Sequence, residues 1–376
     1  MKRQQFPPLK NSNIVYLDNA CMSLRPEQVI QKIEEYYREY PACSGRSAHK
    51  LSRKASEELE TARKNVAGFI DAEKDDILFT SGTTESINTV AKGFDREKVI
   101  ISDREHNSNL VPWQKQEDNI EVIDTENSFN LEKLKKTVEE GDLVSVVHVS
   151  NLDGYELPVK KICRIARENN AYTMIDAAQS IPHQPFSVKE VPADFVAFSG
   201  HKMCGPSGTG ALYVSDRVKQ ELEPLKTGGG AVTNSSYSSN KPKEFPHSFE
   251  AGLPNLAGFI GFGEAINFLE SIGMEKIQEH EKKLTEKARE RIEQMEGVQT
   301  VGKNGEGVIS FHLDNVEPSE AGVMLDRKNI AVRSGMHCVH SWFNDRDIKP
   351  TVRASLYLYN NEKDVERFLD ELKKLA

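Results

Sequence analysis

The sequence predicts an α/β protein with a mainly parallel sheet covered by helices on both faces, followed by a smaller α+β part. Between residues 77 and 214, short apolar runs alternate with stretches of helical spacing. Strands that are apolar along their whole length are typical of parallel sheets with both faces buried. After residue 260 the pattern changes to one long amphipathic stretch and a few separated strands, which predicts the smaller part.

The length of 376 residues favours two domains over one. We expect a large domain over residues 15–260 and a small C-terminal domain over residues 261–376, with residues 1–14 packing on the small one. Hydrophobic residues make up 38% of the chain and charged residues 28%, which is ordinary for a soluble globular protein.

Charge and targeting patterns narrow the class of function. The net charge of −9, from 49 Lys and Arg against 58 Asp and Glu, argues against nonspecific binding to nucleic acid or to an anionic membrane. No apolar segment follows the amino terminus and no window approaches 18 apolar residues, so we expect a cytoplasmic protein without a signal peptide or membrane span. The five cysteines form no Cys-x-x-Cys pair, which disfavours a disulfide framework and a structural zinc site.

The first part of the chain predicts one short strand and two helices. The strand covers residues 14–17, and a helix opens near Pro26. A second, amphipathic helix is expected over residues 51–70, because apolar residues recur there at helical spacing with charged residues between them. These apolar residues are Leu51, Ala55, Leu59, Ala62, Val66 and Phe69.

Short apolar runs bounded by turn residues then indicate the strands of the sheet. They cover residues 77–79, 99–101, 122–123, 143–149, 172–175, 195–198 and 211–214. Residues 226–254 are rich in Gly, Ser, Asn and Pro, and predict either a long functional loop or a linker. In the smaller part we expect a long helix along the apolar stripe 277–295, strands at 308–311, 331–332 and 355–357, and a closing helix over 362–375.

Two complementary groups follow neighbouring predicted strands. Asp176 ends the strand 172–175, and Lys202 lies just beyond the strand 195–198. The carboxyl ends of parallel strands are where α/β proteins build their sites. A lysine there can act as a Schiff-base nucleophile, and a buried carboxylate can hold a proton on a heteroaromatic nitrogen. A solvated turn for Lys202 and a helix N-cap for Asp176 are the alternatives.

Further polar groups follow other predicted strands. Residues 80–85 leave a strand and open a helix, which suits an anion or phosphate seat, although the same residues would also suit an N-cap. His106, Asn151 and Gln179 follow the strands that end near residues 101, 149 and 175. So many polar groups at successive strand ends favour one shared site.

The segment 333–340 contains a candidate nucleophile. Cys338 follows His337 and lies five positions after Arg333 (338 − 333), and such an electropositive setting favours a thiolate. We disfavour zinc binding by its His-Cys-x-His spacing, because zinc needs a fourth ligand and more widely separated residues. A buried, inert thiol is the alternative. Downstream, Arg353 could grip a substrate carboxylate through its planar fork.

Together these residues resemble the aminotransferase class V family of pyridoxal 5′-phosphate (PLP) enzymes, and within it the Suf-type cysteine desulfurases and selenocysteine lyases. The resemblance runs through nearly the whole chain as an ordered series of motifs. These are Tyr16–Ala20, Gly82–Asn88, Glu105–Trp113, His148–Asn151, Asp176–Gln179, Ser199–Lys202, Phe249–Gly252 and Arg333–Cys338. The series is highly specific for the family and less specific for the substrate.

The resemblance implies an aspartate aminotransferase-like PLP enzyme of fold type I, with the cofactor in the large domain. Lys202 would form the Schiff base with the cofactor aldehyde, and Asp176 would pair with the pyridinium nitrogen. His106 would stack on the ring and take part in catalysis. The remaining cofactor contacts would come from Gln179 at the phenolic oxygen, Asn151 near the ring, and Thr83, Thr84, Ser199 and His201 at the phosphate.

The resemblance also implies the reaction. L-Cysteine would be bound by Arg353, Arg333 and Asn151, and Cys338 would take its sulfur as a persulfide while alanine is released. A sulfur-acceptor protein or a small thiol reductant would remove the sulfur from Cys338, for use in iron–sulfur cluster or thiocofactor assembly. The enzyme would be a homodimer, and no metal, nucleic acid or membrane would be involved. Selenocysteine lyase, a class V aminotransferase or racemase without persulfide chemistry, and a non-enzymatic scaffold are the alternatives.

Two positions depart from the family pattern. Leu253 stands where the family usually has a threonine that crosses the dimer interface to the neighbour's phosphate. Without a replacement, loss of that hydrogen bond costs about 1.5–3 kcal/mol of cofactor binding. Met336 stands in place of a histidine, which leaves one fewer potential proton donor near Cys338. We expect either slower activity or delivery of the proton by His337 or His106.

Overall fold

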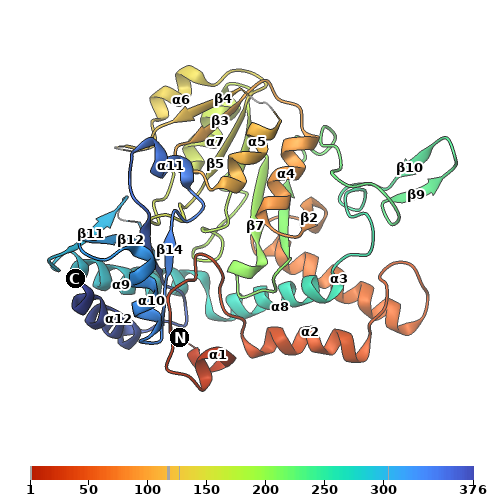
Figure 1. Ribbon diagram of the computed structural model, residues 1–376. Helices are drawn as coiled ribbons and strands as arrows, with labels where there is room; N and C mark the ends of the chain where they lie inside the picture. Colours follow the sequence, from red (N-terminus) through yellow and green to blue (C-terminus); the bar gives the residue numbers. More distant parts are fainter. Residues whose placement is uncertain (1, 117–118, 127, 304) are drawn as a thin grey trace.

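The computed structural model describes residues 2–116, 119–126, 128–303 and 305–376. Within these residues, its largest sheet has seven strands (Figure 1). The strands are, in spatial order, β2 (Ile77–Thr80), β8 (Gly210–Val214), β7 (Phe195–Ser199), β6 (Tyr172–Asp176), β5 (Leu143–Val147), β3 (Val99–Ser102) and β4 (Ile120–Ile123). All neighbours are parallel except that β8 runs antiparallel to both β2 and β7. The predicted mainly parallel sheet is confirmed.

Helices cover both faces of this sheet, and the strand residues alternate between them. In β7, Val196 and Phe198 belong to one core, while Phe195 and Ala197 belong to the other. This period of two is the pleat of a strand buried on both sides. The first core includes residues of α3 (Lys50–Gly68), α6 (Leu131–Thr137), α7 (Val159–Glu168) and α8 (Leu256–Ile272), and the second includes residues of α4 (Thr83–Gly93) and α5 (Val111–Lys115).

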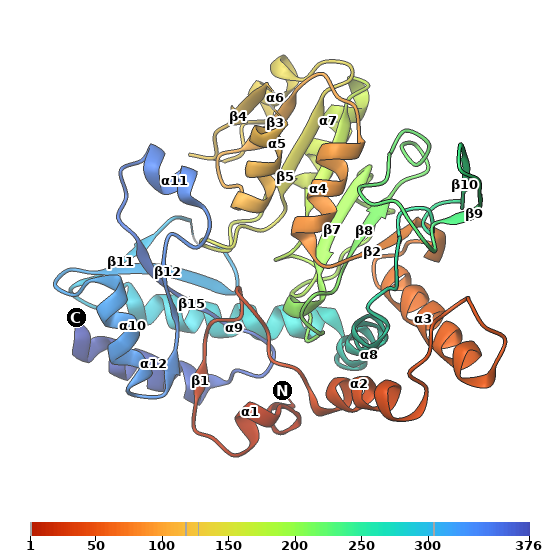
Figure 2. The same cartoon turned by 45° about the vertical axis from the view of Figure 1, so that its right-hand side comes forward.

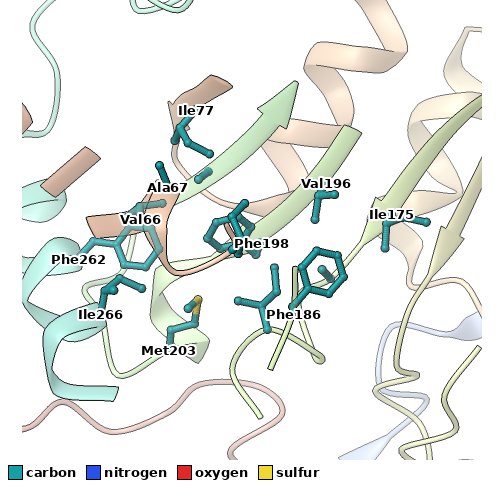
Figure 3. Close-up of a cluster of buried hydrophobic side chains, with 14 of the residues drawn as sticks. Val66, Ala67, Ile77, Ile175, Phe186, Val196, Phe198, Met203, Phe262 and Ile266 are labelled. Atoms are coloured by element: carbon teal, nitrogen blue, oxygen red, sulfur yellow. The ribbon is translucent and has the colours of Figure 1, made fainter. Parts of the chain in front are cut away.

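Helix α8 was not predicted, and its surroundings explain why. It packs against α2 (Glu27–Glu39) and α3 on the first face of the sheet, where Phe262 and Ile266 lie beside Val66 and Met203 (Figure 3). Gly263 approaches α3 so closely that a Cβ there would lie 2.6 Å from the Cα of Ala62. A helix buried on nearly all sides has no polar face, so its sequence lacks the amphipathic period that marks a surface helix.

A second, antiparallel sheet forms the C-terminal part, and it has four strands among the residues described. Their order is β11 (Val298–Val301), β12 (Val308–Leu313), β15 (Thr351–Ser355) and β14 (Arg333–Gly335). Its core contains residues of α9 (Met274–Ile292), α10 (Pro318–Asp326) and α12 (Glu362–Leu375). The strand expected at 355–357 is displaced, because the apolar residues after β15 leave the sheet and join the first core.

The amino-terminal segment lies at the junction of the two parts (Figure 2). Strand β1 (Val15–Tyr16) pairs in parallel with β13 (Ile330–Ala331), and Val15 belongs to the C-terminal core. The ring of Phe6 packs edge-on against the rings of Phe268 and Tyr359. Met1 lies outside the described residues. The division into domains 15–260 and 261–376, with residues 1–14 packed on the smaller domain, stays a proposal. In that division β1 is the first strand of the large domain and pairs with a strand of the small one.

The stretch 226–254 contains a short hairpin that projects from the body (Figures 1 and 2). Its strands are β9 (Val232–Ser235) and β10 (Asn240–Pro242), and Tyr237 is fully exposed at the tip. The remaining helices are α1 (Pro7–Lys10), α11 (His340–Asp345) and the 3-10 turns η1 (Arg3–Gln5), η2 (Lys74–Asp76), η3 (Asn107–Asn109) and η4 (Gly200–Lys202). Within the part of the chain described, no helix is both long and apolar enough to cross a membrane.

Candidate active site

A cavity of about 180 Å³ opens where β5, β6 and β7 end. Ten of the residues singled out in the sequence line this cavity together. They are Thr83, Thr84, His106, Asn151, Asp176, Gln179, Ser199, His201, Lys202 and Arg333. The carboxyl ends of parallel strands meet at one edge of a sheet, which brings these distant residues to one place. The other two, Cys338 and Arg353, lie outside the lining within the described residues.

Asp176 and Lys202 share this cavity. Asp176 is the last residue of β6, is 3% exposed, and its Oδ1 accepts the N–H of Ala178 at 3.0 Å. Burial raises the pKa of Asp176, and the positive charge of Lys202 opposes that rise. Burial lowers the pKa of Lys202 to about 8, against the attraction of Asp176. The lysine can therefore supply a neutral amine near neutral pH.

The start of α4 brings further hydrogen-bonding groups to the same cavity. The N–H and the Oγ1 of Thr83 each lie 2.8 Å from Oγ of Ser199, and Oγ1 of Thr84 lies 2.8 Å from Oγ of Ser108. The N-cap residue is Gly82, with a φ of +147°, and no side chain caps the helix. The hydroxyl groups and the positive end of α4 therefore favour an anion at this edge.

The turn that carries His106 is held by a buried carboxyl group. Glu105 accepts hydrogen bonds from the N–H of Ser102, the N–H of Val147 and the amide of Asn109. Burial raises the pKa of Glu105 to about 8. Next to it, the Nδ1 of His106 accepts the N–H of Ser108 at 3.0 Å.

These contacts define the state of the imidazole of His106. Because Nδ1 is an acceptor, the proton of the neutral ring lies on Nε2. Burial, followed by the charges of Lys202 and Arg333, lowers the pKa of His106 to about 3. His106 is therefore a neutral ring with a donor at Nε2. His201, also in the lining, has its pKa lowered to about 4 by burial and by Lys202.

Gln179 and Asn151 have different bonding states. The Nε2 of Gln179 donates to the carbonyl of Ala20 at 2.6 Å, while its buried Oε1 has no hydrogen-bond partner among the residues described. The Nδ2 of Asn151 donates to the carbonyl of His337 at 2.7 Å. Asn151 thus fastens the thiol-bearing loop to the pocket, whereas Gln179 keeps an acceptor available.

Arg353 is completely buried behind the pocket. It lies within β15, which is hydrogen-bonded to β12 on one side and β14 on the other. Its Nη1 donates to the carbonyl of Asn151 at 2.9 Å, and its Nη2 lies 3.3 Å from Oδ1 of Asp18. Burial lowers its pKa to about 10. Its predicted contact with a substrate carboxylate stays a prediction, and Arg333 is the arginine that lines the cavity.

Cys338 lies on the loop between β14 and α11. His337 and Cys338 both have positive φ, at 51° and 61°. The carbonyl of Cys338 accepts the N–H of Asn107 at 2.7 Å, and its Sγ lies 3.5 Å from Nη2 of Arg333. Arg333 thus contacts the thiol of Cys338 and the cavity at once.

The neighbours of Cys338 are fixed by packing. The Nε2 of buried His337 lies 2.8 Å from Oγ1 of Thr351, and burial and Arg353 lower the pKa of His337 to about 2. A neutral imidazole carries no positive charge, so His337 does not stabilise a thiolate at Cys338 electrostatically. Met336 packs against a small core of Leu152, Val339, Trp342 and Phe343.

Sequence reasoning gave no role to Cys21 and Ser108, yet both line the cavity. Cys21 directly follows the motif Tyr16–Ala20, and Ser108 lies inside the motif Glu105–Trp113. A side chain that follows a strand by a few residues was the available signal. At Leu253 the side chain is 62% exposed, on the same stretch as the hairpin.

Comparison with known proteins decides the family. A family model described as aminotransferase class V matches residues 15–368. This chain belongs to that family. The class V match covers both the large sheet and most of the C-terminal part, which agrees with the spread of motifs along the chain.

Individual class V relatives agree over nearly their full length. The chain is 37% identical to a probable cysteine desulfurase of Halalkalibacterium halodurans, over 99% of this chain and 96% of that protein. It is similar to the apo structure of a cysteine desulfurase from Thermococcus onnurineus NA1, with 37% identity, a TM-score of 0.94, and coverage of 99% and 96%. The Escherichia coli cysteine desulfurase CsdA, in an S-sulfonic acid form, gives 28% identity, a TM-score of 0.91, and coverage of 99% and 97%. The predicted fold type I is confirmed.

Proposed function

We propose that this class V protein is a PLP-dependent cysteine desulfurase, which converts L-cysteine to L-alanine and takes the sulfur onto Cys338. The observation that carries the proposal is a single pocket that holds an amine, Lys202, and a carboxyl group, Asp176, with a thiol attached to its rim through Arg333. Relatives named probable cysteine desulfurase, at 37% and 39% identity, support it. An aminotransferase or racemase would have no use for the thiol.

The residues of the pocket fit PLP. An aldehyde requires a neutral amine, and Lys202 has a pKa of about 8. A protonated ring nitrogen requires a carboxylate, which Asp176 offers. A phosphate requires donors and a helix N-terminus, which Thr83 and Thr84 offer at α4. The unpartnered Oε1 of Gln179 is one more polar group that a ligand would satisfy.

When bound, PLP supplies a carbonyl group for the substrate amine and a ring that withdraws electrons. The residues of this chain do the rest. Lys202 moves the proton of the substrate Cα, and the thiolate of Cys338 attacks the substrate sulfur. A bond forms between Sγ of Cys338 and that sulfur while the bond from the sulfur to Cβ breaks. Arg333 stabilises the negative charge of the thiolate before the attack.

The fate of the sulfur follows from this chemistry. A persulfide on Cys338 must be unloaded by a second thiol, from an acceptor protein or a small thiol reductant, and we propose that it supplies iron–sulfur cluster or thiocofactor assembly. We further propose a homodimer that works in the cytoplasm. The projecting hairpin with exposed Tyr237 and the exposed Leu253 support a surface for a second copy.

The decisive experiment measures alanine and sulfide formed from L-cysteine in the presence of a thiol reductant. For Cys338→Ala, we expect turnover to fall by at least about a hundredfold, because the nucleophile is removed. The matched control is Cys43→Ala, since Cys43 is an exposed free cysteine outside the pocket. Undiminished turnover in Cys338→Ala would exclude the persulfide mechanism. Replacing L-cysteine by L-selenocysteine in the same assay distinguishes a selenocysteine lyase, which would prefer that substrate.

A further inference from the structure

The loop that carries Cys338 leads directly into helix α11, and this helix packs on the part of the chain that carries the large sheet. Trp342 and Phe343 of α11 are buried. They share a small core with Leu152, which directly follows Asn151 of the pocket. The position of α11, and of the loop before it, therefore depends on contacts with the large-sheet part.

An ion pair joins the end of α11 to the end of β3. Arg346 is the C-cap residue of α11, and its Nη2 donates to Oδ2 of Asp103, the residue that follows β3. The side chain of Asp103 is 9% exposed and that of Arg346 is 27% exposed. The other oxygen of Asp103, Oδ1, accepts the hydroxyl of Thr125 at 2.7 Å. Both oxygens of this carboxylate are therefore bonded, which fixes its direction.

The indole ring of Trp342 lies against two guanidinium groups. The Cζ of Arg346 is 5.0 Å from the ring centre, and the Cζ of Arg104 is 5.4 Å from it. Arg104 is itself held, because its Nη1 donates to Oδ2 of Asp153 at 2.5 Å and its Nε donates to Oγ1 of Thr125 at 2.6 Å. Guanidinium groups stack favourably on aromatic faces, so Trp342 is attached to the large-sheet part as well as to its own helix.

These contacts come from the segment 103–107, which also carries His106 of the cavity. Asn107 of this segment donates its N–H to the carbonyl of Cys338 at 2.7 Å, and its Nδ2 lies 2.9 Å from Nδ1 of His340, the first residue of α11. One short segment therefore contacts the loop at Cys338 and the helix α11 at both of its ends.

The place of Cys338 gives this attachment a consequence for the reaction. Among the residues described, Cys338 is not part of the cavity lining, but its Sγ lies 3.5 Å from Nη2 of Arg333, which is. A thiol at the edge of a cavity reacts only while its loop holds it within reach of the bound substrate. Positioning of this kind changes the rate of the chemical step more than the binding of substrate.

We propose that Arg346 and Trp342 are positioning residues, which hold the Cys338 loop where its thiol can reach the sulfur of the substrate. Together with Asp103 and Arg104 they form what we call the α11 clasp. The clasp rests on the proposed desulfurase function, and it adds to that function a set of residues outside the cavity.

The rate at which Cys338 gains sulfur tests the clasp. The PLP-loaded protein is mixed with excess L-cysteine and no other thiol, quenched with an alkylating agent at successive times, and the Cys338 peptide is followed by mass spectrometry. For Arg346→Ala we expect the rate to fall about tenfold. Arg346→Lys keeps the charge and should restore the rate to within about threefold of the wild type. Trp342→Leu keeps an apolar side chain without an aromatic face and should lower the rate about fivefold.

The matched control is Asp345→Asn. Oδ2 of Asp345 lies 3.3 Å from Nη1 of Arg346, but this carboxylate is 77% exposed and belongs to α11 itself. Removing its charge leaves the connection to the large-sheet part intact, so the variant should keep the wild-type rate.

A double variant tests whether Asp103 and Arg346 act through one ion pair. Asp103→Asn should slow the gain of sulfur to about the same extent as Arg346→Ala, and the variant with both changes should be no slower than either one. Additive effects of the two changes would contradict the ion pair as their shared cause.

Steady-state kinetics with a saturating thiol reductant separates positioning from a general loss of structure. In Arg346→Ala, kcat should fall while KM for L-cysteine and the cofactor absorbance stay as in the wild type, because Arg346 lies outside the cavity lining. Melting temperatures are measured beside the wild type. Arg346→Lys and Asp103→Asn preserve most of the side-chain volume, so they keep the test valid if Arg346→Ala is less stable.

Three results would overturn the clasp. They are an unchanged rate in Arg346→Ala, an equal fall in Asp345→Asn, or a fall in Arg346→Ala that comes with a raised KM or a loss of cofactor absorbance. In each of these cases the wild type still gains sulfur on Cys338, so the desulfurase proposal stands. A wild type in which Cys338 gains no sulfur from L-cysteine would overturn both proposals.

Discussion

The two walls of the pocket are built in different ways. The sheet wall consists of Asp176, Lys202 and the start of α4, and these groups sit at the ends of buried parallel strands. The C-terminal wall consists of Arg333, which lines the cavity from an edge strand of an antiparallel sheet, and of two residues next to it outside the lining. These are Cys338 on a loop and Arg353 on a central strand of the same sheet. The first wall is set by the topology of one sheet, and the second by side-chain contacts.

This difference assigns different tasks to the two walls. The sheet wall can hold a cofactor in one place, because buried Asp176 ends a strand and buried Thr83 begins a helix. The C-terminal wall presents the thiol of Cys338 on a loop in which His337 and Cys338 both have positive φ. A variant that alters one wall should therefore leave the function of the other wall measurable, either as cofactor absorbance or as turnover of L-cysteine.

The largest effect is expected at the sheet wall, from Lys202→Ala. Turnover of L-cysteine should fall by at least about a thousandfold, because the variant loses the amine that we propose binds the cofactor and moves the proton. The absorbance of the lysine-bound cofactor at about 420 nm should also disappear. Lys135→Ala is the control, since Lys135 lies on the surface in an exposed pair with Glu132. A variant that kept the absorbance and turnover would remove the sheet wall from the mechanism.

A smaller effect is expected at the C-terminal wall, from Asp18→Asn. Arg353 would lose its charged partner, which lies 3.3 Å away, and an interaction of this kind contributes about 1.5–3 kcal/mol. We expect KM for L-cysteine to rise about tenfold to a hundredfold, with kcat and cofactor absorbance nearly unchanged. Asp216→Asn, at an exposed carboxylate, is the control. A fall in kcat at constant KM would mean that Arg353 does not serve substrate binding.

The pH dependence should give the smallest effect and should report the sheet wall alone. The pKa of Lys202 is about 8, so its neutral fraction increases as pH rises from 7 to 9. The rate at which cofactor-free protein takes up PLP should therefore increase about tenfold over this range. His106 and His337, with pKa values of about 3 and 2, stay neutral throughout. A stopped-flow absorbance profile that fell across this range would contradict the assignment of Lys202.

The fold was predictable where the sequence alternates between short apolar strands and amphipathic helices. The seven strand positions of the large sheet and helices α3, α9 and α12 follow from such local patterns. Helix α8 was missed because it is buried on nearly all sides and has no amphipathic period. The displacement of β15 has a related cause, since Tyr357, Leu358 and Tyr359 belong to the core of the large sheet rather than to the core of their own sheet.

The site was predictable to the same extent as the sheet that carries it. Asp176, Lys202 and His106 follow strands, and parallel topology alone brings such residues together. Arg353 lies in the middle of a strand, and its position depends on Asp18, which is distant in sequence and joined to it only in the folded chain. No local pattern marks such a contact. The presence of Cys21 in the pocket likewise depends on how β1 pairs with β13.

The hydrogen bond from the N–H of Asn107 to the carbonyl of Cys338 joins the thiol loop to the turn of His106. A loop that moves outward to hand its sulfur to another protein must break this bond, and the turn beside the cofactor then loses a support. In the proposed reaction, sulfur uptake and sulfur export would therefore be successive events rather than simultaneous ones. While an acceptor protein is bound to the displaced loop, the enzyme could not react with its next substrate, and it could do so only after the loop has returned.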